Sequence, residues 1–410
     1  RTGLGGPERH DIAIVRERVK LEDQAARMEL VSTVRTNSAG EAVPVRVAVI
    51  ELPSFYSDPN EKGLLSSKSA RSAVADVRRL LQACQTAGVD GVVLDMQRNG
   101  GGLLEEAVDV AGLFLKRGNV VMARDRRRSV NMLADTDPAV YYSGPVVVTI
   151  SRATASGAEI VAGILQDYQR ALIVGGDHTF GKGTIQQVIP LPGRLGALKI
   201  TVGEYFIASG RSTQHAGVTP DIAVPSELSA YDIGEQYQPS ALPARAVDAQ
   251  LSSRTRIGAG GSGWQPVTAD EIARLALESS QRVGASPAFE KVRESVAKVR
   301  AEREKESITI AALLENATTN SAKSDLDEPD EPPPARPALT NDIVVMEAVE
   351  IMADWVTGEQ RAPDMQLIAE ARRAVSNAAV PAAAQAPAAA LPVPVRAAIT
   401  NSLSDERSVR

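Results

Sequence analysis

The chain has 410 residues and a formal net charge of −6, from 45 Lys and Arg against 51 Asp and Glu. This length suggests two to three domains, and the acidic balance and scarce aromatic residues argue against a nucleic-acid binder. A single cysteine, Cys84, excludes an internal disulfide and a cysteine-based zinc site. Three histidines limit metal and histidine chemistry, and arginine outnumbers lysine by 35 to 10. We find no signal peptide and no apolar run of about 20 residues, the length of a membrane span.

Hydrophobic patterns along the chain alternate between strand and helix. The expected strands lie at 46–52, 91–96, 145–151, 171–175 and 198–207, the last as an edge or barrel-type strand. The expected helices lie at 68–87, 103–115, 157–169, 268–283, 286–306 and 342–355. Cys84 falls on the apolar stripe of the first helix and is expected in the core. Alternation from 46 to 175 predicts an α/β domain with a largely parallel sheet, whose ligands bind at the carboxyl ends of the strands.

Three segments could carry chemistry. Ser156 lies in a small-residue turn before a helix, where main-chain N–H groups could stabilise an oxyanion. Lys182 lies between two glycines, and burial among strands would lower its pKa enough for a general base. A turn of sequence NGGG at 99–102 follows a strand and could face a bound carbonyl group or admit an extended substrate.

The rival interpretations of these segments are weaker. The GKGT sequence departs from a phosphate-binding loop because Gly183 separates Lys182 from Thr184, and the NGGG turn lacks the dinucleotide pattern GxGxxG. His178 invites a serine–histidine pair with Ser156, but only Asp177 beside it could orient the imidazole. His10 and His215 are expected at the surface or in turns.

Taken in this order, the segments resemble the C-terminal processing, or tail-specific, peptidases, which are serine peptidases with a Ser–Lys pair. The matching sequences include VAVIELPSFY (47–56), VVLDMQRNGGGLLEEAVDVAGLF (92–114), the block 145–187 and STQHAGVTPDIAVPS (212–226). The resemblance is closest to the Gram-negative periplasmic tail-specific protease. It implies an α/β core of the Clp-protease/crotonase type with a mostly helical C-terminal domain.

The resemblance also assigns the site residues. Ser156 would be the nucleophile, Lys182 the general base and Gln186 the residue that orients the lysine. The oxyanion would be held by N–H groups of Gly157 and of Gly100 or Gly101. Asp167 matches a charge-relay residue of the family, although a carboxylate near the lysine would hold it charged, which favours a structural role. The family sequence SASASEI reads TASGAEI here, and one residue is inserted near 175–178.

The family implies the partners as well. We expect protein substrates with apolar C-termini, a tetratricopeptide-repeat lipoprotein adaptor as a possible partner, a periplasmic location, and no metal, cofactor or nucleic acid. Two alternatives stay open, a catalytically silent binding paralogue and an acyl-CoA enzyme of the related fold.

The expected organisation has six parts. They are the end of a PDZ domain with a connecting strand at 11–21 (1–40), the peptidase core (41–228), a helical region (229–324), an acidic Pro-rich linker (325–340), an amphipathic helix (341–360) and a low-complexity, disordered tail (361–410). We expect that Arg1 lies within or just after a PDZ domain.

Overall fold

The computed structural model describes residues 25–36, 40–57, 71–193, 195–251, 264–304 and 336–358, with the backbone of two short strands, β1 (Thr2–Gly3) and β2 (Gly6–Pro7). The expected strand at 11–21 and the expected tail lie outside these residues.

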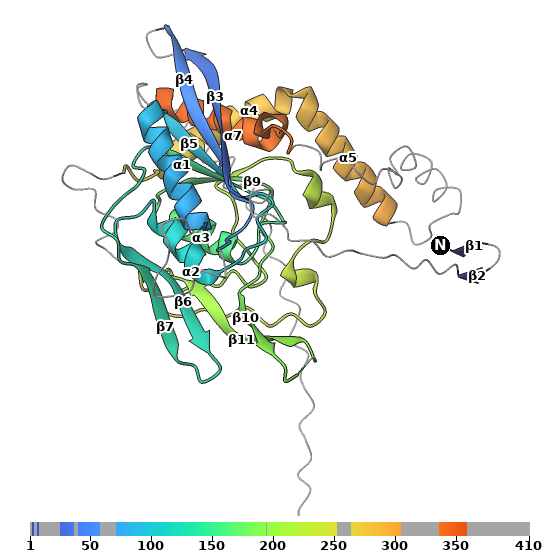
Figure 1. The fold of residues 1–410 in the computed structure, drawn as a ribbon. Helices are drawn as coiled ribbons and strands as arrows, with labels where there is room; N and C mark the ends of the chain where they lie inside the picture. Colours follow the sequence, from blue (N-terminus) through green and yellow to red (C-terminus); the bar gives the residue numbers. More distant parts are fainter. Residues whose placement is uncertain are drawn as a thin grey trace, which may run out of the picture.

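A six-stranded sheet forms the centre of the molecule (Figure 1). Its order is β12-β9-β8-β5-β4-β3, in which neighbours pair in parallel except for the antiparallel pair of β3 and β4. The strands span Arg27–Thr36 (β3), Ala42–Glu51 (β4), Gly91–Asp95 (β5), Val146–Ile150 (β8), Leu172–Gly175 (β9) and Ile222–Ala223 (β12). The predicted parallel α/β sheet is therefore confirmed, with β3 as an addition that the sequence did not predict.

Helices cover both faces of this sheet, which explains why its inner strands are apolar throughout. Three helices lie on one face: α1 (Ala73–Ala87), α2 (Leu104–Gly112) and α3 (Gly157–Asp167). The other face is covered by α4 (Ala269–Ala285) and α7 (Ile343–Gly358), with α5 (Pro287–Arg303) beside them (Figure 1). Successive residues of β4 point to opposite faces, so that Ile50 joins the core under α1–α3 and Val49 joins the core under α7.

The last described helix, α7, belongs to the core of the molecule. The sequence predicts an amphipathic helix set apart by a linker, but α7 is buried almost all around and contacts β3, β4, β5 and β8. Met352 of α7 packs so closely on Gly91 that a Cβ there would lie 2.2 Å from its sulfur. The last residues of the expected linker (325–340) also contact the core, because Leu339 is buried and Arg336 donates a hydrogen bond to Glu51.

A second sheet of four antiparallel strands stands beside the first, in the order β10-β11-β6-β7. Its strands span Gly118–Asp125 (β6), Val130–Asp135 (β7), Thr184–Pro190 (β10) and Ala197–Ile207 (β11). The strand expected at 198–207 is confirmed as β11; it is not an edge strand along its whole length, because residues 203–207 pair with β6 as well. The other three strands were not predicted: β10 is mostly exposed and β7 is buried only at its last residue, whereas β6 contains the short buried run 120–122 that the sequence analysis missed.

Local signals set the helix ends. Ser72 accepts a hydrogen bond from the Ala75 N–H at the start of α1, and Gly88 ends that helix with φ +61°. Cys84 is fully buried, as predicted. In the described part of the chain, three short 3₁₀ turns complete the elements, at Glu227–Ala230 (η3), Glu235–Tyr237 (η4) and Leu339–Asn341 (η6). Within the described residues, no helix has both the length and the hydropathy needed to cross a membrane.

Candidate active site

The turn from β8 into α3 presents Ser156 in a strained conformation. Its backbone has φ +57° and ψ −116°, a combination that is costly for a residue with a Cβ. Nucleophilic serines of other hydrolases occupy sharp strand-to-helix turns of this kind, which expose the hydroxyl above the sheet. The strain is held in place on one side by a hydrogen bond from the Ala155 N–H to the carbonyl of Asn99.

The glycine turn at 99–102 lies directly against Ser156. A Cβ on Gly101 would come within 2.8 Å of the Ser156 Cβ and 3.2 Å of the Gly157 nitrogen. Asn99 is fully buried and fixes this turn, since it donates to the Leu52 carbonyl and accepts from the Gly101 N–H at 2.9 Å. The Gly101 N–H is thereby occupied. Within the described part of the chain, the N–H groups of Gly100 and Gly157 have no protein acceptor.

Lys182 approaches the serine turn on a loop that only glycines permit. Gly181 has φ +88°, and a Cβ there would lie 2.6 Å from the His215 carbonyl oxygen, as predicted for a lysine flanked by glycines. The Lys182 ammonium donates to the Thr184 carbonyl at 3.1 Å. Burial lowers the pKa of Lys182 below its usual 10.5, and the nearby Lys199 ammonium acts in the same direction.

Glu159 joins the serine turn to the lysine loop, a role that the sequence analysis missed. Its carboxylate is fully buried and accepts hydrogen bonds from the N–H groups of Ser156 (2.8 Å), Gly181 (2.7 Å) and Lys182 (2.9 Å) and from the Thr179 hydroxyl (2.5 Å). Burial raises the pKa of Glu159 to about 7. The Ser-x-x-Glu spacing from Ser156 to Glu159 is a capping-box pattern, and this signal could have identified it.

Tyr205 of β11 is a second residue that the sequence did not reveal. Its buried hydroxyl lies 3.2 Å from the Ser156 carbonyl oxygen, beside the Lys182 carbonyl oxygen and 2.9 Å from the Thr213 hydroxyl. The second sheet therefore helps to fix both the nucleophile turn and the lysine loop. No local pattern could have indicated this, since the contact joins residues 49 positions apart.

These elements enclose one cavity of about 480 Å³. It contains the predicted nucleophile and base, Ser156 and Lys182, together with Gly157 and Gly100. Its remaining walls are formed by Gly102, Leu103, Leu104, Glu105, Ile160, Thr184, Ile185, Gln186, Lys199 and Tyr205. Gly101 does not line it but supports Ser156 from behind. The tertiary structure thus brings together the three segments that the sequence singled out.

Gln186 lines the same cavity but lies on the strand β10, one residue beyond Ile185, where the pairing of β10 with β11 shifts register. The four-residue spacing from Lys182, which suggests a helical turn, is therefore spanned by loop and strand. The side chain of Gln186 is exposed, and the acceptor for Lys182 is the Thr184 carbonyl.

The structure does not bring Asp167 to this cavity. Asp167 ends α3, whereas Ser156 precedes that helix, so the helix separates them by about 16 Å at 1.5 Å per residue. Its carboxylate pairs with Arg211 at 3.1 Å. This placement disagrees with a charge relay and fits a structural role. His178 is also absent from the cavity lining, and its Nδ1 lies 2.6 Å from the Thr179 carbonyl oxygen.

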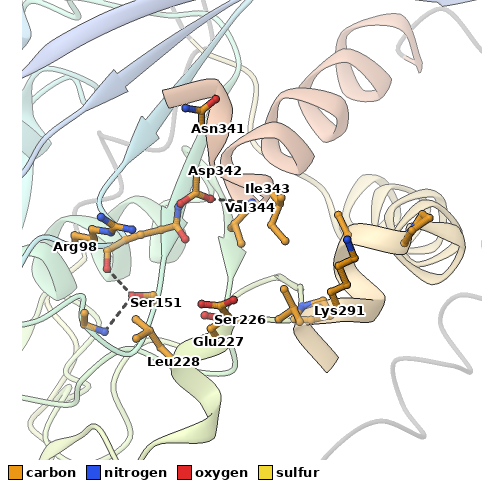
Figure 2. A pocket seen from close by; sticks show the side chains of 16 residues that line it. Arg98, Ser151, Ser226, Glu227, Leu228, Lys291, Asn341, Asp342, Ile343 and Val344 are labelled. Atoms are coloured by element: carbon orange, nitrogen blue, oxygen red, sulfur yellow. Dashed lines mark hydrogen bonds between the residues drawn. The ribbon is translucent and has the colours of Figure 1, made fainter. Parts of the chain in front are cut away.

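A larger cavity of about 790 Å³ lies behind the same loops, between the carboxyl end of the sheet and the C-terminal helices (Figure 2). Arg98 and Ser151 border it from the core, and Lys291 and Asp342 border it from the helical side. It holds no serine–lysine pair. Among the described residues, we find no cluster of three His, Cys, Asp or Glu side chains that could bind a metal ion.

The chain is similar in sequence to known peptidases. Residues 46–224 match the model of peptidase family S41. The tail-specific protease of Haemophilus influenzae is 35% identical over 238 residues, which cover 56% of this chain and 31% of that protein. The carboxy-terminal-processing protease of Bartonella bacilliformis is 38% identical over 173 residues, which cover 41% of this chain and 39% of that protein. The chain thus spans about a third of the length of these relatives.

Among solved structures, the photosystem II D1 C-terminal processing protease is similar, with 29% identity, 48% of each chain covered and a TM-score of 0.40. The matched segment contains all three chemistry-bearing segments and both residues, Glu159 and Tyr205, that connect them. Residues 46–224 therefore match peptidase family S41, and the relatives named above are a tail-specific protease and a carboxy-terminal-processing protease.

Proposed function

We propose that the chain is a serine endopeptidase that uses Ser156 and Lys182 and acts on the C-terminal tails of proteins. The observation that carries this proposal is the shared cavity, in which a strained serine, a half-buried lysine and two backbone N–H groups without an acceptor among the described residues meet. The names of the relatives supply the class of substrate.

In the proposed reaction, neutral Lys182 removes the proton from the Ser156 hydroxyl as its oxygen attacks the scissile carbonyl. The N–H groups of Gly157 and Gly100 hold the oxyanion of the tetrahedral intermediate. Lys182 then gives its proton to the leaving amine, which departs with the C-terminal fragment. The acyl-enzyme is hydrolysed by a water molecule, from which Lys182 again takes the proton. Gln186 and Lys199 line the same cavity as Lys182.

A lowered pKa is what this mechanism requires of Lys182. At the usual value only about one lysine in 2,500 is neutral at pH 7, whereas burial favours the neutral amine. Glu159 does not hold the lysine charged by a direct ion pair, because its oxygens bind backbone N–H groups and the Thr179 hydroxyl. Its contribution to the proposed site is position.

Beyond the reaction, the family resemblance leads us to propose substrates with apolar C-terminal residues, a periplasmic location and a tetratricopeptide-repeat lipoprotein as an adaptor. Cell fractionation tests the location, and co-purification with the adaptor tests the partner. Both are separate from the test of the chemistry.

The test of the chemistry is cleavage of an unfolded protein with an apolar C-terminus, followed by mass spectrometry of the fragments. We expect Ser156→Ala and Lys182→Ala to lose about six orders of magnitude in rate, as when the nucleophile or its base is removed from another serine hydrolase. Ser280→Ala is the matched control, because Ser280 is exposed on α4 and does not line the cavity around Ser156. Equal cleavage by all variants would refute the assignment. Absence of cleavage by every form would favour the silent paralogue, and thioester turnover instead would favour an acyl-CoA enzyme.

A further inference from the structure

One end of the second sheet carries an apolar surface that the proposed reaction does not use. The strands β10 and β11 extend well beyond their neighbours: the last pair between β11 and β6 is Gly203 with Asp125, and residues 197–202 pair only with β10. At about 3.3 Å per residue, this two-stranded ribbon projects about 20 Å from the sheet. Figure 1 shows it pointing away from α4, α5 and α7.

The ribbon exposes aliphatic side chains to solvent. Leu195 is 76% exposed, Val188 60% and Leu198 51%. Ile189 and Leu191 are partly exposed as well, and Ile189 faces Leu198 across the ribbon. An isolated two-stranded ribbon is marginally stable in water, and a cluster of exposed aliphatic residues indicates a binding surface.

Cations surround this apolar tip, although the chain as a whole is acidic. The sequence from Thr184 to Gly203 contains no Asp or Glu. The adjacent turn between β6 and β7 reads Arg-Asp-Arg-Arg-Arg at 124–128, and antiparallel pairing of β6 with β11 places this turn at the same end of the sheet. Asp125 accepts hydrogen bonds from two N–H groups of its own turn. Among the described residues, Arg126 and Arg127 have no ion-pair partner.

We propose that these two hairpin tips, residues 124–130 and the described residues 188–193 and 195–198, form a docking surface for a bilayer that contains anionic phospholipid. The aliphatic side chains would enter the interface while the arginines contact the headgroups, a combination that makes peripheral membrane binding stable. A second copy of the chain is a poorer occupant, because a symmetric contact would place the arginines of one tip against those of the other, and the carboxylate of each tip, Asp125, already accepts hydrogen bonds within its own turn.

The docking surface would also hold the candidate active site at a fixed distance from the membrane. Thr184, Gln186 and Lys199, which line the cavity around Ser156, lie on the same ribbon, and about five residues separate Gln186 from the turn. If the proposed function holds, the cavity would open about 16 Å from the lipid surface, within reach of the tails of membrane-anchored proteins.

Sedimentation with lipid vesicles tests the docking surface independently of proteolysis. We expect binding to vesicles in which phosphatidylglycerol replaces part of the phosphatidylcholine, weaker binding at high salt, and little binding to phosphatidylcholine alone. Arg126→Glu combined with Arg127→Glu should weaken binding about tenfold or more. Leu195→Ser combined with Leu198→Ser should weaken it to a similar extent.

Two double variants serve as matched controls. Lys291→Glu with Lys298→Glu reverses two exposed charges on α5, and Leu30→Ser with Val34→Ser removes two exposed aliphatic residues of β3. Both should bind like the wild type. The proposal would be overturned if the protein did not bind vesicles, or bound neutral and anionic vesicles equally. It would also be overturned if the control variants lost as much binding as the hairpin variants, or if the hairpin substitutions dissociated a dimer or a protein complex. Hairpin variants should still cleave a soluble substrate. Failure of all forms to cleave while vesicle binding persists would refute the proposed function alone.

Discussion

A single added methyl group can test whether the glycine turn shapes the nucleophile. Gly101 has φ +103°, and the Cβ of an alanine there would lie 2.8 Å from the Ser156 Cβ and 3.0 Å from the Ala155 carbonyl oxygen. Gly100 is the matched control, because its φ is not positive and a Cβ there would have no atom within 4 Å. The two neighbouring substitutions therefore differ in backbone strain and in steric overlap with Ser156, while both keep the backbone N–H groups of the turn.

The expected magnitude follows from these contacts. An alanine at positive φ costs about 1–2 kcal/mol, and the overlap with Ser156 must be relieved by movement of the serine turn. A displacement of about 1 Å in a catalytic group can reduce a rate about 100-fold. We therefore expect Gly101→Ala to react with a phosphonate serine probe about 100-fold more slowly, and Gly100→Ala to stay within about threefold of the wild type.

The assay is the rate at which the probe labels Ser156, measured by intact-protein mass spectrometry, with circular dichroism to confirm folding. Equal rates for Gly101→Ala and the wild type would refute the inferred packing of the turn against the nucleophile. Equal and large losses in both variants would also refute it, since the structure leaves room at Gly100.

Three further results are expected. In the Glu159→Gln variant, the probe should label Ser156 at least about tenfold more slowly, because an amide NH₂ would face N–H donors that now bind a carboxylate oxygen. A labelling rate within about twofold of the wild type would contradict this. The labelling rate should rise with pH as Lys182 loses its proton, and the midpoint should lie below the usual lysine pKa of 10.5, because burial lowers the pKa of Lys182. Ionisation of Glu159 near pH 7 should add a second rise. A single midpoint at 10.5 or above would exclude Lys182 as a partly buried base. Asp167→Asn should keep the labelling rate within about twofold of the wild type but lower the melting temperature, because the ion pair with Arg211 is lost. A large loss of labelling rate in a stably folded variant would instead support a charge-relay role for Asp167.

Local sequence patterns were sufficient for four of the six strands of the central sheet and for its helices. The strands β4, β5, β8 and β9 are buried on both faces, so each appears as an uninterrupted apolar run. The strands of the second sheet have no such run, because many of their residues face solvent. Helix α7 was assigned correctly, but its position could not be predicted, since only packing against β5 and β8 shows that it closes one face of the core.

The sequence by itself determined which residue types could act, because a serine in a small-residue turn and a lysine between glycines are local patterns. Only the tertiary structure decided which candidates meet. It placed Ser156, Lys182 and Gln186 around one cavity and left Asp167 at the far end of α3. It also revealed Glu159 and Tyr205 as the residues that join the serine turn to the lysine loop. The physical reason is that their hydrogen bonds join segments 20 to 50 residues apart, which no periodicity in the sequence records.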